Sequence, residues 1–483
     1  MELSMEQLLE IENDRKILEF RFAYKDTPVW PFVRFCALQS LQMNTLQKPG
    51  KYRNSASAVR DSFLSKLGSG IVKNPFFSAR KPIMFLYGCG GNVSDETGRI
   101  YNRIFDDFAG LYQHSTYVLD CTDRDIAKKS RLKKHYTYLM DSAVHSMVET
   151  GSTDPKDVAM AGRFLQYLNK RMLPFTLTHS QIENIRQLVL LYSKKIKYQD
   201  MFYRRLFQWV HPEIVFIEDG CYGERNAYLC KVLSELKIPS AEIQHGWIGA
   251  QHIAYNYGKT IRESREYRTY MPDYYCGMAD YWLEQISAPV KKICFGNPAF
   301  WTKYNQFYKR SKEREEERKK KTILWLGFEN DTRNMEVLRE FLTLTQGEFQ
   351  ILLRNHPLLK EKSDPLYKNL LRNHPNLLMD KSQTVYEAFT ESDYVVSEVS
   401  TAIYEALAFG KQVFVYQSAL SRHFGMTEVA AGFKDAKQLS VILSDHKTCE
   451  KKKETVYKET FFAMQWKRNY SNFLKECTGI NFK

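Results

Sequence analysis

The chain has 483 residues, 43% of them hydrophobic, so it is long enough for two or more domains and too apolar for a disordered protein. Its formal net charge of +14 predicts an anionic partner, which we expect to be a substrate or an acidic membrane leaflet. Nucleic acid is not expected, because the basic residues are spread along the chain and no nucleic-acid motif is present. Nine cysteines without CxxC spacing indicate neither a disulfide framework nor a zinc site. No apolar run reaches the roughly 18 residues of a membrane span, and the acidic N-terminus does not read as a signal peptide, so we expect a cytoplasmic protein.

Residues 1–80 are predicted to form a mostly helical N-terminal region. A strand follows at 82–87, and it ends in the glycine-rich turn Gly88–Asn92. A ligand could approach the backbone of such a turn closely, although its spacing is neither GxGxxG nor a P-loop. A second strand is predicted at 115–119, and apolar residues at helical spacing predict long helices over much of 154–209.

The next segment predicts a strand–helix–strand unit with polar residues at both strand ends. The strand 213–217 ends at Glu218-Asp219-Gly220, and the strand 241–243 ends at Gln244-His245-Gly246. Open α/β sheets bind ligands at this carboxyl edge. A carboxylate beside an imidazole is what a general base needs to take the proton of a hydroxyl. The structural alternative is a solvated acidic loop and a turn histidine.

The most charged run of the chain, 302–321, is predicted to be a solvated linker or an exposed helix at the boundary between two domains. It separates an N-terminal Rossmann-like acceptor domain over 81–301 from a C-terminal Rossmann-like nucleotide-donor domain over 322–449. The tail, 450–483, is predicted to form closing helices.

In the second domain the strand 349–353 ends at Arg354-Asn355-His356-Pro357. A later strand, 394–396, leads through Ser397, Ser400 and Thr401 into a helix over 402–409, and a further strand is predicted at 412–416. Hydroxyls at a helix N-terminus suit a phosphate, and Glu405, one turn on, could contact a ribose. The structural alternative is that the hydroxyls only cap the helix.

Together these patterns predict an α/β protein with two Rossmann-like domains facing across a cleft. The second domain would hold a nucleotide phosphate through Arg354, His356 and the hydroxyls, while the first would supply the base. The predicted reaction is transfer of a group from a nucleotide-activated donor to an alcohol.

The layout resembles the GT-B glycosyltransferases of bacterial capsule, O-antigen and lipopolysaccharide synthesis. Three short motifs are similar to those of bacterial sialyltransferases and polysialyltransferases, namely Glu218-Asp219-Gly220, His356-Pro357 and Ser400-Thr401. The resemblance implies that Glu218 is the general base, that His356 binds or protonates the donor phosphate, and that Ser400 and Thr401 hold the CMP phosphate. It implies a CMP-sugar donor such as CMP-sialic acid or CMP-Kdo, inversion at the anomeric carbon, and no metal or cofactor.

The segment around Gln244-His245-Gly246 is also similar to a wider group of capsule and O-antigen transferases, and to CDP-glycerol glycerophosphotransferases. That resemblance implies that His245, and not Glu218, is the base, so both candidates stay open. The acceptor would be a growing surface polysaccharide or a lipid-linked glycan, at the inner face of the membrane, with the protein bound peripherally. The alternatives are a UDP-sugar transferase, a nucleotide-sugar epimerase with a comparable SxxxxEA segment, and a non-catalytic membrane-docking assembly protein.

Overall fold

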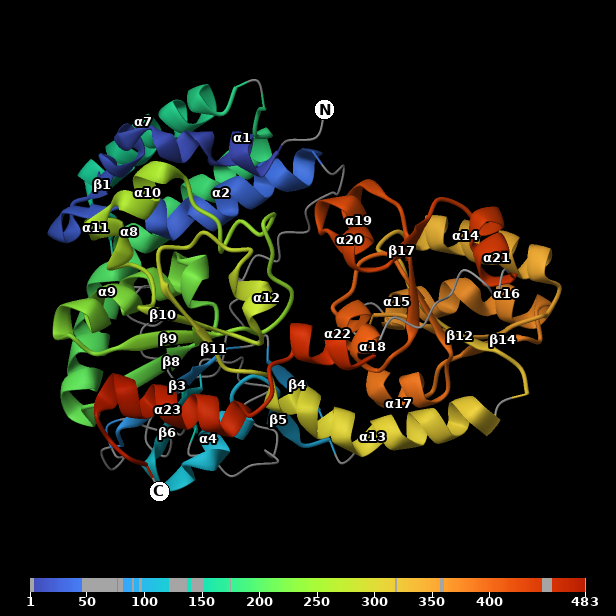
Figure 1. Cartoon of the computed structure of the whole chain (residues 1–483). Helices are drawn as coiled ribbons and strands as arrows, with labels where there is room; N and C mark the ends of the chain where they lie inside the picture. The colour runs from blue at the N-terminus through green and yellow to red at the C-terminus, as the bar shows by residue number, and fades with distance from the viewer. Residues whose placement is uncertain are drawn as a thin grey trace, which may run out of the picture. The chain divides into compact units, whose positions relative to one another are not determined.

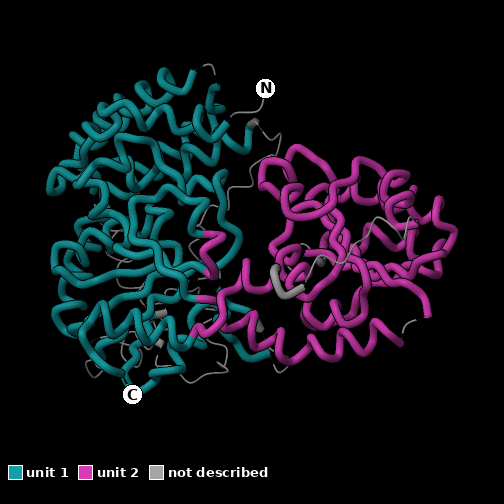
Figure 2. The backbone as a smooth tube through the Cα atoms, viewed as in Figure 1, with its two compact units in different colours: residues 1–277, 283–295, 467–483 teal, residues 278–282, 296–466 magenta. Residues whose placement is uncertain are grey.

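The computed structural model describes residues 4–45, 76, 81–88, 91–94, 98–120, 137–139, 152–173, 175–317, 319–356, 360–444 and 454–482. The chain forms two compact units, which Figure 2 colours separately. Unit 1 comprises residues 1–277, 283–295 and 467–483, and unit 2 comprises residues 278–282 and 296–466. Each unit contains one parallel α/β sheet, so the prediction of two Rossmann-like domains is confirmed. The cleft between them stays a prediction.

Unit 1 is built on a seven-stranded parallel sheet in the order β11-β10-β9-β8-β3-β6-β7. Its strands are β3 (Ile83–Tyr87), β6 (Thr116–Asp120), β7 (Thr137–Leu139), β8 (Ile214–Ile217), β9 (Ser240–Ile243), β10 (Tyr274–Gly277) and β11 (Lys291–Cys294). The central strands β3 and β8 are apolar and buried throughout, as expected for a sheet covered on both faces. Counted along the chain, the order is 7-6-5-4-1-2-3, so the direction of winding reverses between β3 and β8.

The helices of unit 1 begin at residues that favour helix starts. The two long ones are α7 (Pro155–Arg171), which follows an Asp154 cap and has proline in its first turn, and α8 (His179–Val210), which begins at a capping box of Thr178 and Gln181. The others include α4 (Asp106–Leu111), α9 (Ala227–Leu236), α10 (Lys259–Glu263), α11 (Arg265–Arg268) and the last helix, α23 (Trp466–Thr478). In α23, Phe473 packs on Tyr274 and Phe295 at ring distances of 5.1 Å.

The described part of the N-terminal region belongs to unit 1. It contains α1 (Met5–Leu9), the short strands β1 (Arg21–Phe22) and β2 (Thr27–Pro28), and α2 (Trp30–Thr45), and the helices lie near α7, α8 and α10 in Figure 1. A buried ion pair fixes it: Arg34 Nε donates to Glu12 at 2.5 Å, and Glu12 also accepts from the Gly258 N–H at 2.8 Å. The predicted helical region at 1–80 therefore packs as part of the first domain, while 46–75 and 77–80 lie outside the described residues.

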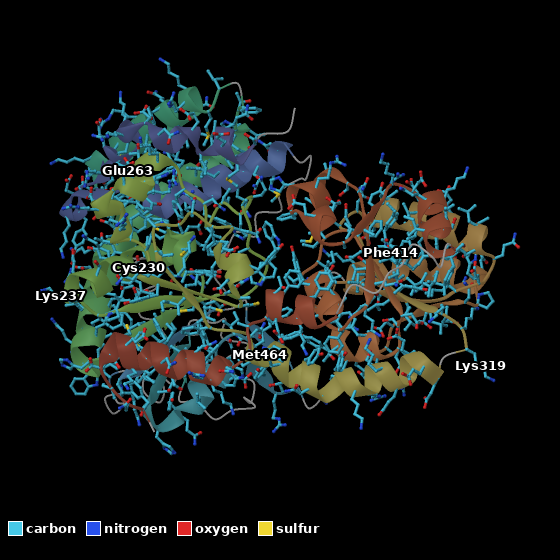
Figure 3. All side chains as sticks on the ribbon, in the orientation of Figure 1. Cys230, Lys237, Glu263, Lys319, Phe414 and Met464 are labelled. Atoms are coloured by element: carbon cyan, nitrogen blue, oxygen red, sulfur yellow. The ribbon has the colours of Figure 1, made fainter. Side chains whose placement is uncertain are left out.

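Unit 2 is built on a six-stranded parallel sheet in the order β14-β13-β12-β15-β16-β17. Its strands are β12 (Thr322–Leu326), β13 (Gln350–Arg354), β14 (Leu377–Met379), β15 (Tyr394–Ser397), β16 (Gln412–Tyr416) and β17 (Ala431–Phe433). Phe414 of β16, labelled in Figure 3, belongs to the core of this unit. Along the chain the order is 3-2-1-4-5-6, so here the winding reverses between β12 and β15.

Two helices of unit 2 overlap the charged run 302–321 and the tail 450–483 of the predicted domain division. The helices of this unit include α13 (Pro298–Glu317), α14 (Asp331–Thr345), α15 (Lys360–Ser363), α16 (Lys368–Asn373), α17 (Val385–Thr390), α18 (Ala402–Ala408), α19 (Ala419–His423), α20 (Met426–Val429), α21 (Ala436–Ser444) and α22 (Glu454–Phe461). The charged run 302–321, predicted as a solvated linker or an exposed helix, lies mostly in α13, because buried Ser311 bonds the Phe389 carbonyl of α17 and Arg314 pairs with Glu391. The predicted closing helices of 450–483 are divided, since α22 packs on α18 in unit 2 and α23 belongs to unit 1.

Within the residues that the structure describes, no helix is both long enough and apolar enough to cross a membrane.

Candidate active site

The carboxyl ends of the strands at the two winding reversals hold most of the predicted site residues. In unit 1 the reversal lies between the turn after β3, which begins at Gly88, and the segment after β8, which begins at Glu218-Asp219. In unit 2 it lies between the turn after β12 and the segment Glu398–Thr401 after β15. Ligands of doubly wound sheets bind at such reversals, so each unit has one edge at which to look for a site.

Glu218 is buried and bonded to the backbone of the glycine-rich turn. Its two carboxylate oxygens accept hydrogen bonds from the Gly88 N–H at 2.8 Å and the Gly91 N–H at 3.1 Å. Burial, and next the neighbouring Asp219, raise the pKa of Glu218, while the Gly88 N–H opposes the rise. A side chain at Gly88 would meet the Glu218 carboxyl carbon at 2.8 Å, which explains the glycine there. Glu218 therefore occupies the amide donors that an anionic ligand of this turn would need.

Asp219 and His245 form a carboxylate–imidazole pair at the ends of adjacent strands. Asp219 has a φ of 61°, in the left-handed region that aspartate tolerates, and its Oδ1 lies 3.5 Å from His245 Nδ1. Arg225 Nη2 lies 3.8 Å from the other oxygen of Asp219, and exposed Arg103 donates to the His245 carbonyl at 3.2 Å. Among the described residues, no hydrogen bond is made to either ring nitrogen of His245, whose side chain is 22% exposed. This pair can accept a proton at the sheet edge.

Sequence reasoning missed a buried cluster behind this pair. Glu242 in β9 accepts from the Cys221 N–H at 2.6 Å and from the Tyr255 hydroxyl at 2.7 Å, and its Oε1 lies 4.0 Å from His245 Nδ1. Burial raises the pKa of Glu242 to about 7. A carboxylate inside a strand that otherwise reads as buried is the one signal that could have revealed it. Nothing local to Tyr255 sets it apart from the other tyrosines.

Arg354 and His356 lie at and just after the end of β13. Arg354, the last residue of β13, pairs with Asp380 and donates to the Ser382 carbonyl at 2.9 Å, so its guanidinium ties two strand ends together. His356 is exposed two residues later. Pro357 lies outside the described residues, so the predicted role of the His-Pro motif stays a prediction.

The hydroxyls after β15 differ in their surroundings. Ser397 is buried, and no described residue forms a hydrogen bond with its Oγ. Ser400 Oγ accepts from the Ala402 N–H at 3.2 Å at the start of α18, whereas Thr401 is exposed and makes no capping bond. Between them, the carboxylate of Glu398 accepts from the Glu329 N–H at 2.9 Å. Ser397, Ser400 and Thr401 are therefore neighbours at the winding reversal of unit 2, as predicted from the chain order.

Glu405, predicted to contact a ribose, accepts a hydrogen bond from the Tyr386 hydroxyl of α17. Its carboxylate thus joins two helices of unit 2, and a contact with a ribose would have to share that oxygen or use the other one. Among the described residues, no three histidine, cysteine, aspartate or glutamate side chains are placed to hold a metal ion.

Comparison with known proteins yields neither a matching family model nor a matching curated sequence. Solved structures do show similarity. S. aureus MnaA, whose structure contains UDP, aligns with a TM-score of 0.48 and 11% identity over 83% of this chain and 98% of its own. The UDP-GlcNAc 2-epimerase of Methanocaldococcus jannaschii gives a TM-score of 0.47 and 10% identity over 82% and 99% of the two chains. The wall teichoic acid polymerase TagF gives 0.46 and 12% identity over 92% and 97%. With these TM-scores below 0.5, the likeness carries no inference about the reaction of this chain.

Proposed function

We propose that this chain is a glycosyltransferase that moves a sugar from a nucleotide-activated donor to a hydroxyl of a surface polysaccharide or a lipid-linked acceptor, with inversion and without a metal. Unit 1 binds the acceptor and supplies the base, and unit 2 binds the donor nucleotide. The observation that carries the proposal is the Asp219–His245 pair, 3.5 Å apart at the carboxyl edge of the first sheet. A carboxylate next to an imidazole favours the protonated ring that results when a hydroxyl is deprotonated.

His245 is the base in this proposal, and Glu218 is not. Glu218 is buried and accepts hydrogen bonds from two backbone amides, so a substrate hydroxyl would have to displace one of them. His245 Nε2 has no hydrogen-bond partner in the described part of the chain, and its side chain is partly exposed. Asp219 then favours the positive charge on the ring from the Nδ1 side, at 3.5 Å.

The donor-binding residues in this proposal are Ser397, Ser400 and Thr401, with a contribution from His356. The buried Ser397 hydroxyl makes no hydrogen bond to a described residue, and in this proposal it donates to a phosphate oxygen. A cytidine nucleotide is common to both motif resemblances of this sequence, whether the donor is a CMP-sugar or CDP-glycerol. We favour a CMP-sugar because three motifs of the chain are similar to those of sialyltransferases.

A donor screen tests this proposal directly. The purified chain is incubated with CMP-, CDP- and UDP-activated donors, and thermal stabilisation is measured before transfer to acceptor glycans is followed by mass spectrometry. We expect stabilisation by cytidine nucleotides and transfer that requires an acceptor. Stabilisation by UDP compounds alone would contradict the cytidine donor, and conversion of a donor without any acceptor would identify an epimerase.

The net charge of +14 supports peripheral association with an anionic inner membrane surface. In this proposal binding to anionic vesicles is electrostatic and weakens as ionic strength rises. Vesicle sedimentation at low and high salt measures it, with neutral vesicles as the control. Binding that does not change with salt would contradict an electrostatic attachment.

A further inference from the structure

Glu242 is a fully buried carboxylate held at a fixed position next to His245. It lies in β9, three residues before the histidine, and receives hydrogen bonds from two different segments. The Cys221 N–H comes from the turn after β8, and the Tyr255 hydroxyl comes from the loop between β9 and α10. The Glu242 oxygen that accepts from Tyr255 is the one 4.0 Å from His245 Nδ1. The carboxylate therefore cannot turn away from the imidazole without losing a hydrogen bond.

The hydrogen-bond donors to Glu242 are a backbone N–H and a tyrosine hydroxyl, so they bring no positive charge to the carboxylate when it is ionised. A buried carboxylate without a cation nearby is costly. The His245 imidazole acts against the burial effect that raises the pKa of Glu242, which places the two groups in electrostatic contact. A negative charge on Glu242 and a positive charge on His245 therefore favour each other.

The other groups around this pair do not supply that positive charge. Asp219 is itself acidic and lies 3.5 Å from the same Nδ1. The Tyr222 ring lies 5.9 Å from the His245 ring, and its hydroxyl is 3.2 Å from His252 Nε2. Burial lowers the pKa of His252 to about 3, so it is neutral at neutral pH. Tyr222, Tyr255 and Tyr275 stay protonated, because burial raises their pKa values well above the ordinary one. Two arginines lie near the pair: Arg225 Nη2 is 3.8 Å from Asp219, and exposed Arg103 donates to the His245 backbone carbonyl at 3.2 Å.

We propose that Glu242 is a second positioning residue for His245, acting together with Asp219 on the Nδ1 side of the ring. The inference rests on the proposed function. The acceptor hydroxyl gives its proton to Nε2, and its oxygen bonds to the sugar carbon. The bond from that carbon to the nucleotide phosphate breaks with its electron pair on the phosphate oxygen. The imidazolium formed in this step then has two carboxylates at Nδ1, and it later releases the proton to solvent.

A titration that does not depend on enzymatic activity tests the electrostatic contact between Glu242 and His245. The ¹³C carboxyl resonance of Glu242 is assigned by its loss in Glu242→Gln, or in Glu242→Asp if the glutamine variant does not fold, and is followed with pH in the wild-type chain. In His245→Asn we expect the carboxylate to ionise at higher pH, because the imidazole that lowered its pKa is gone. In Asp219→Asn we expect ionisation at lower pH, because a neighbouring negative charge is gone. An unchanged Glu242 titration in His245→Asn would overturn the proposal.

Kinetics give the second readout. Glu242→Gln should lower kcat on the order of 10-fold to 10²-fold, less than loss of the base itself, and move the pH profile while KM changes little. The matched control is Asp157→Asn in α7, which removes a buried carboxylate that accepts a hydrogen bond from the Ala23 N–H. This substitution should leave kcat and the pH profile unchanged. A folded Glu242→Gln with wild-type kcat and pH profile would contradict the proposal. If Glu242→Gln does not fold, the titration in His245→Asn carries the test.

A failure of the proposed function can be distinguished from a failure of the positioning role of Glu242. If the proposed function is wrong, the wild-type chain transfers no group from any donor, yet the Glu242 titration still reports its coupling to His245. If only the positioning role is wrong, transfer occurs and neither the titration nor the pH profile responds to the substitutions.

Discussion

The two units carry the same local arrangement at their winding reversals, with different surroundings. In each unit the first residue after the fourth strand is a buried glutamate whose carboxylate accepts a hydrogen bond from the turn after the first strand. Glu218 accepts from Gly88 and Gly91 in unit 1, and Glu398 accepts from Glu329 in unit 2. A feature that recurs in both units belongs to the fold and does not by itself mark catalysis.

The groups next to the two glutamates are what distinguish the units. Beside Glu218 lie an imidazole and two further carboxylates, His245, Asp219 and Glu242, which can hold and release a proton. Beside Glu398 lie hydroxyls, of which the buried Ser397 has no partner among the described residues. Unit 1 is therefore suited to acid–base chemistry and unit 2 to holding an anion.

The largest effect is expected from removing the imidazole of unit 1. His245→Asn should lower kcat by on the order of 10²–10⁴-fold, because the imidazole takes the acceptor proton in the proposed reaction, while the affinity for the nucleotide is retained. Steady-state transfer assays and calorimetric binding separate the two quantities. The control is His179→Ala, an exposed histidine at the start of α8 in the same unit. Wild-type kcat in His245→Asn would show that unit 1 does not supply the base.

The paired glutamates should behave alike. Glu218→Gln and Glu398→Gln each weaken a charged hydrogen bond to backbone, so each should lower the free energy of unfolding by about 1–3 kcal/mol. In the fraction that is folded, neither substitution should approach the kinetic loss of His245→Asn. Chemical denaturation and active-site-normalised rates measure this. A stable Glu218→Gln that loses activity as severely as His245→Asn would restore Glu218 as the base.

In unit 2 the buried hydroxyl is expected to bind the donor phosphate. Ser397→Ala should weaken nucleotide binding about tenfold, since a hydrogen bond to a charged group is worth roughly 1.5 kcal/mol or more. The free energy of unfolding without ligand should not fall, because no described residue forms a hydrogen bond with the Ser397 hydroxyl that the substitution would break. Calorimetry and denaturation are compared for the same variant. Unchanged affinity in Ser397→Ala would remove this serine from the phosphate site.

The smallest effect is expected from the His-Pro motif, for which the chain offers an internal control. The sequence Arg-Asn-His-Pro occurs twice, at 354–357 starting from the last residue of β13 and at 372–375 starting in the last turn of α16. His356→Ala should weaken donor binding a few-fold, about 1 kcal/mol for one exposed contact, and His374→Ala should not. Equal effects of both substitutions on donor affinity would contradict a role for the first motif.

The strands of the two domains could be predicted well from apolar runs bounded by turns. The predicted limits of β16 coincide with the structure, and β3, β6, β8, β9, β13 and β15 lie within one or two residues of their predictions. Within the two large sheets, the strands β7, β10, β14 and β17 were not predicted; they are three or four residues long, which leaves little room for a periodic pattern.

The site was predictable only where chain order alone brings residues to a strand end. The positions of Asp219, His245 and Ser400 after strand ends were predicted in this way, and their roles stay predictions. The Glu218 carboxylate accepts hydrogen bonds from two glycine amides about 130 residues earlier in the chain. The Arg354 guanidinium forms an ion pair with Asp380, which follows a neighbouring strand. Glu242 and Tyr255 matter because they are buried together. Such partners are set by tertiary packing, and a sequence pattern does not contain them.

Hydrogen–deuterium exchange with and without a cytidine nucleotide tests the division of labour between the units most directly. The account predicts slower exchange on nucleotide binding in peptides that cover Ser397–Ala402 of unit 2, and no change in peptides that cover Gly88 and Gly91 of unit 1, whose amides Glu218 already occupies. Protection at the glycine-rich turn of unit 1, without protection after β15, would contradict it.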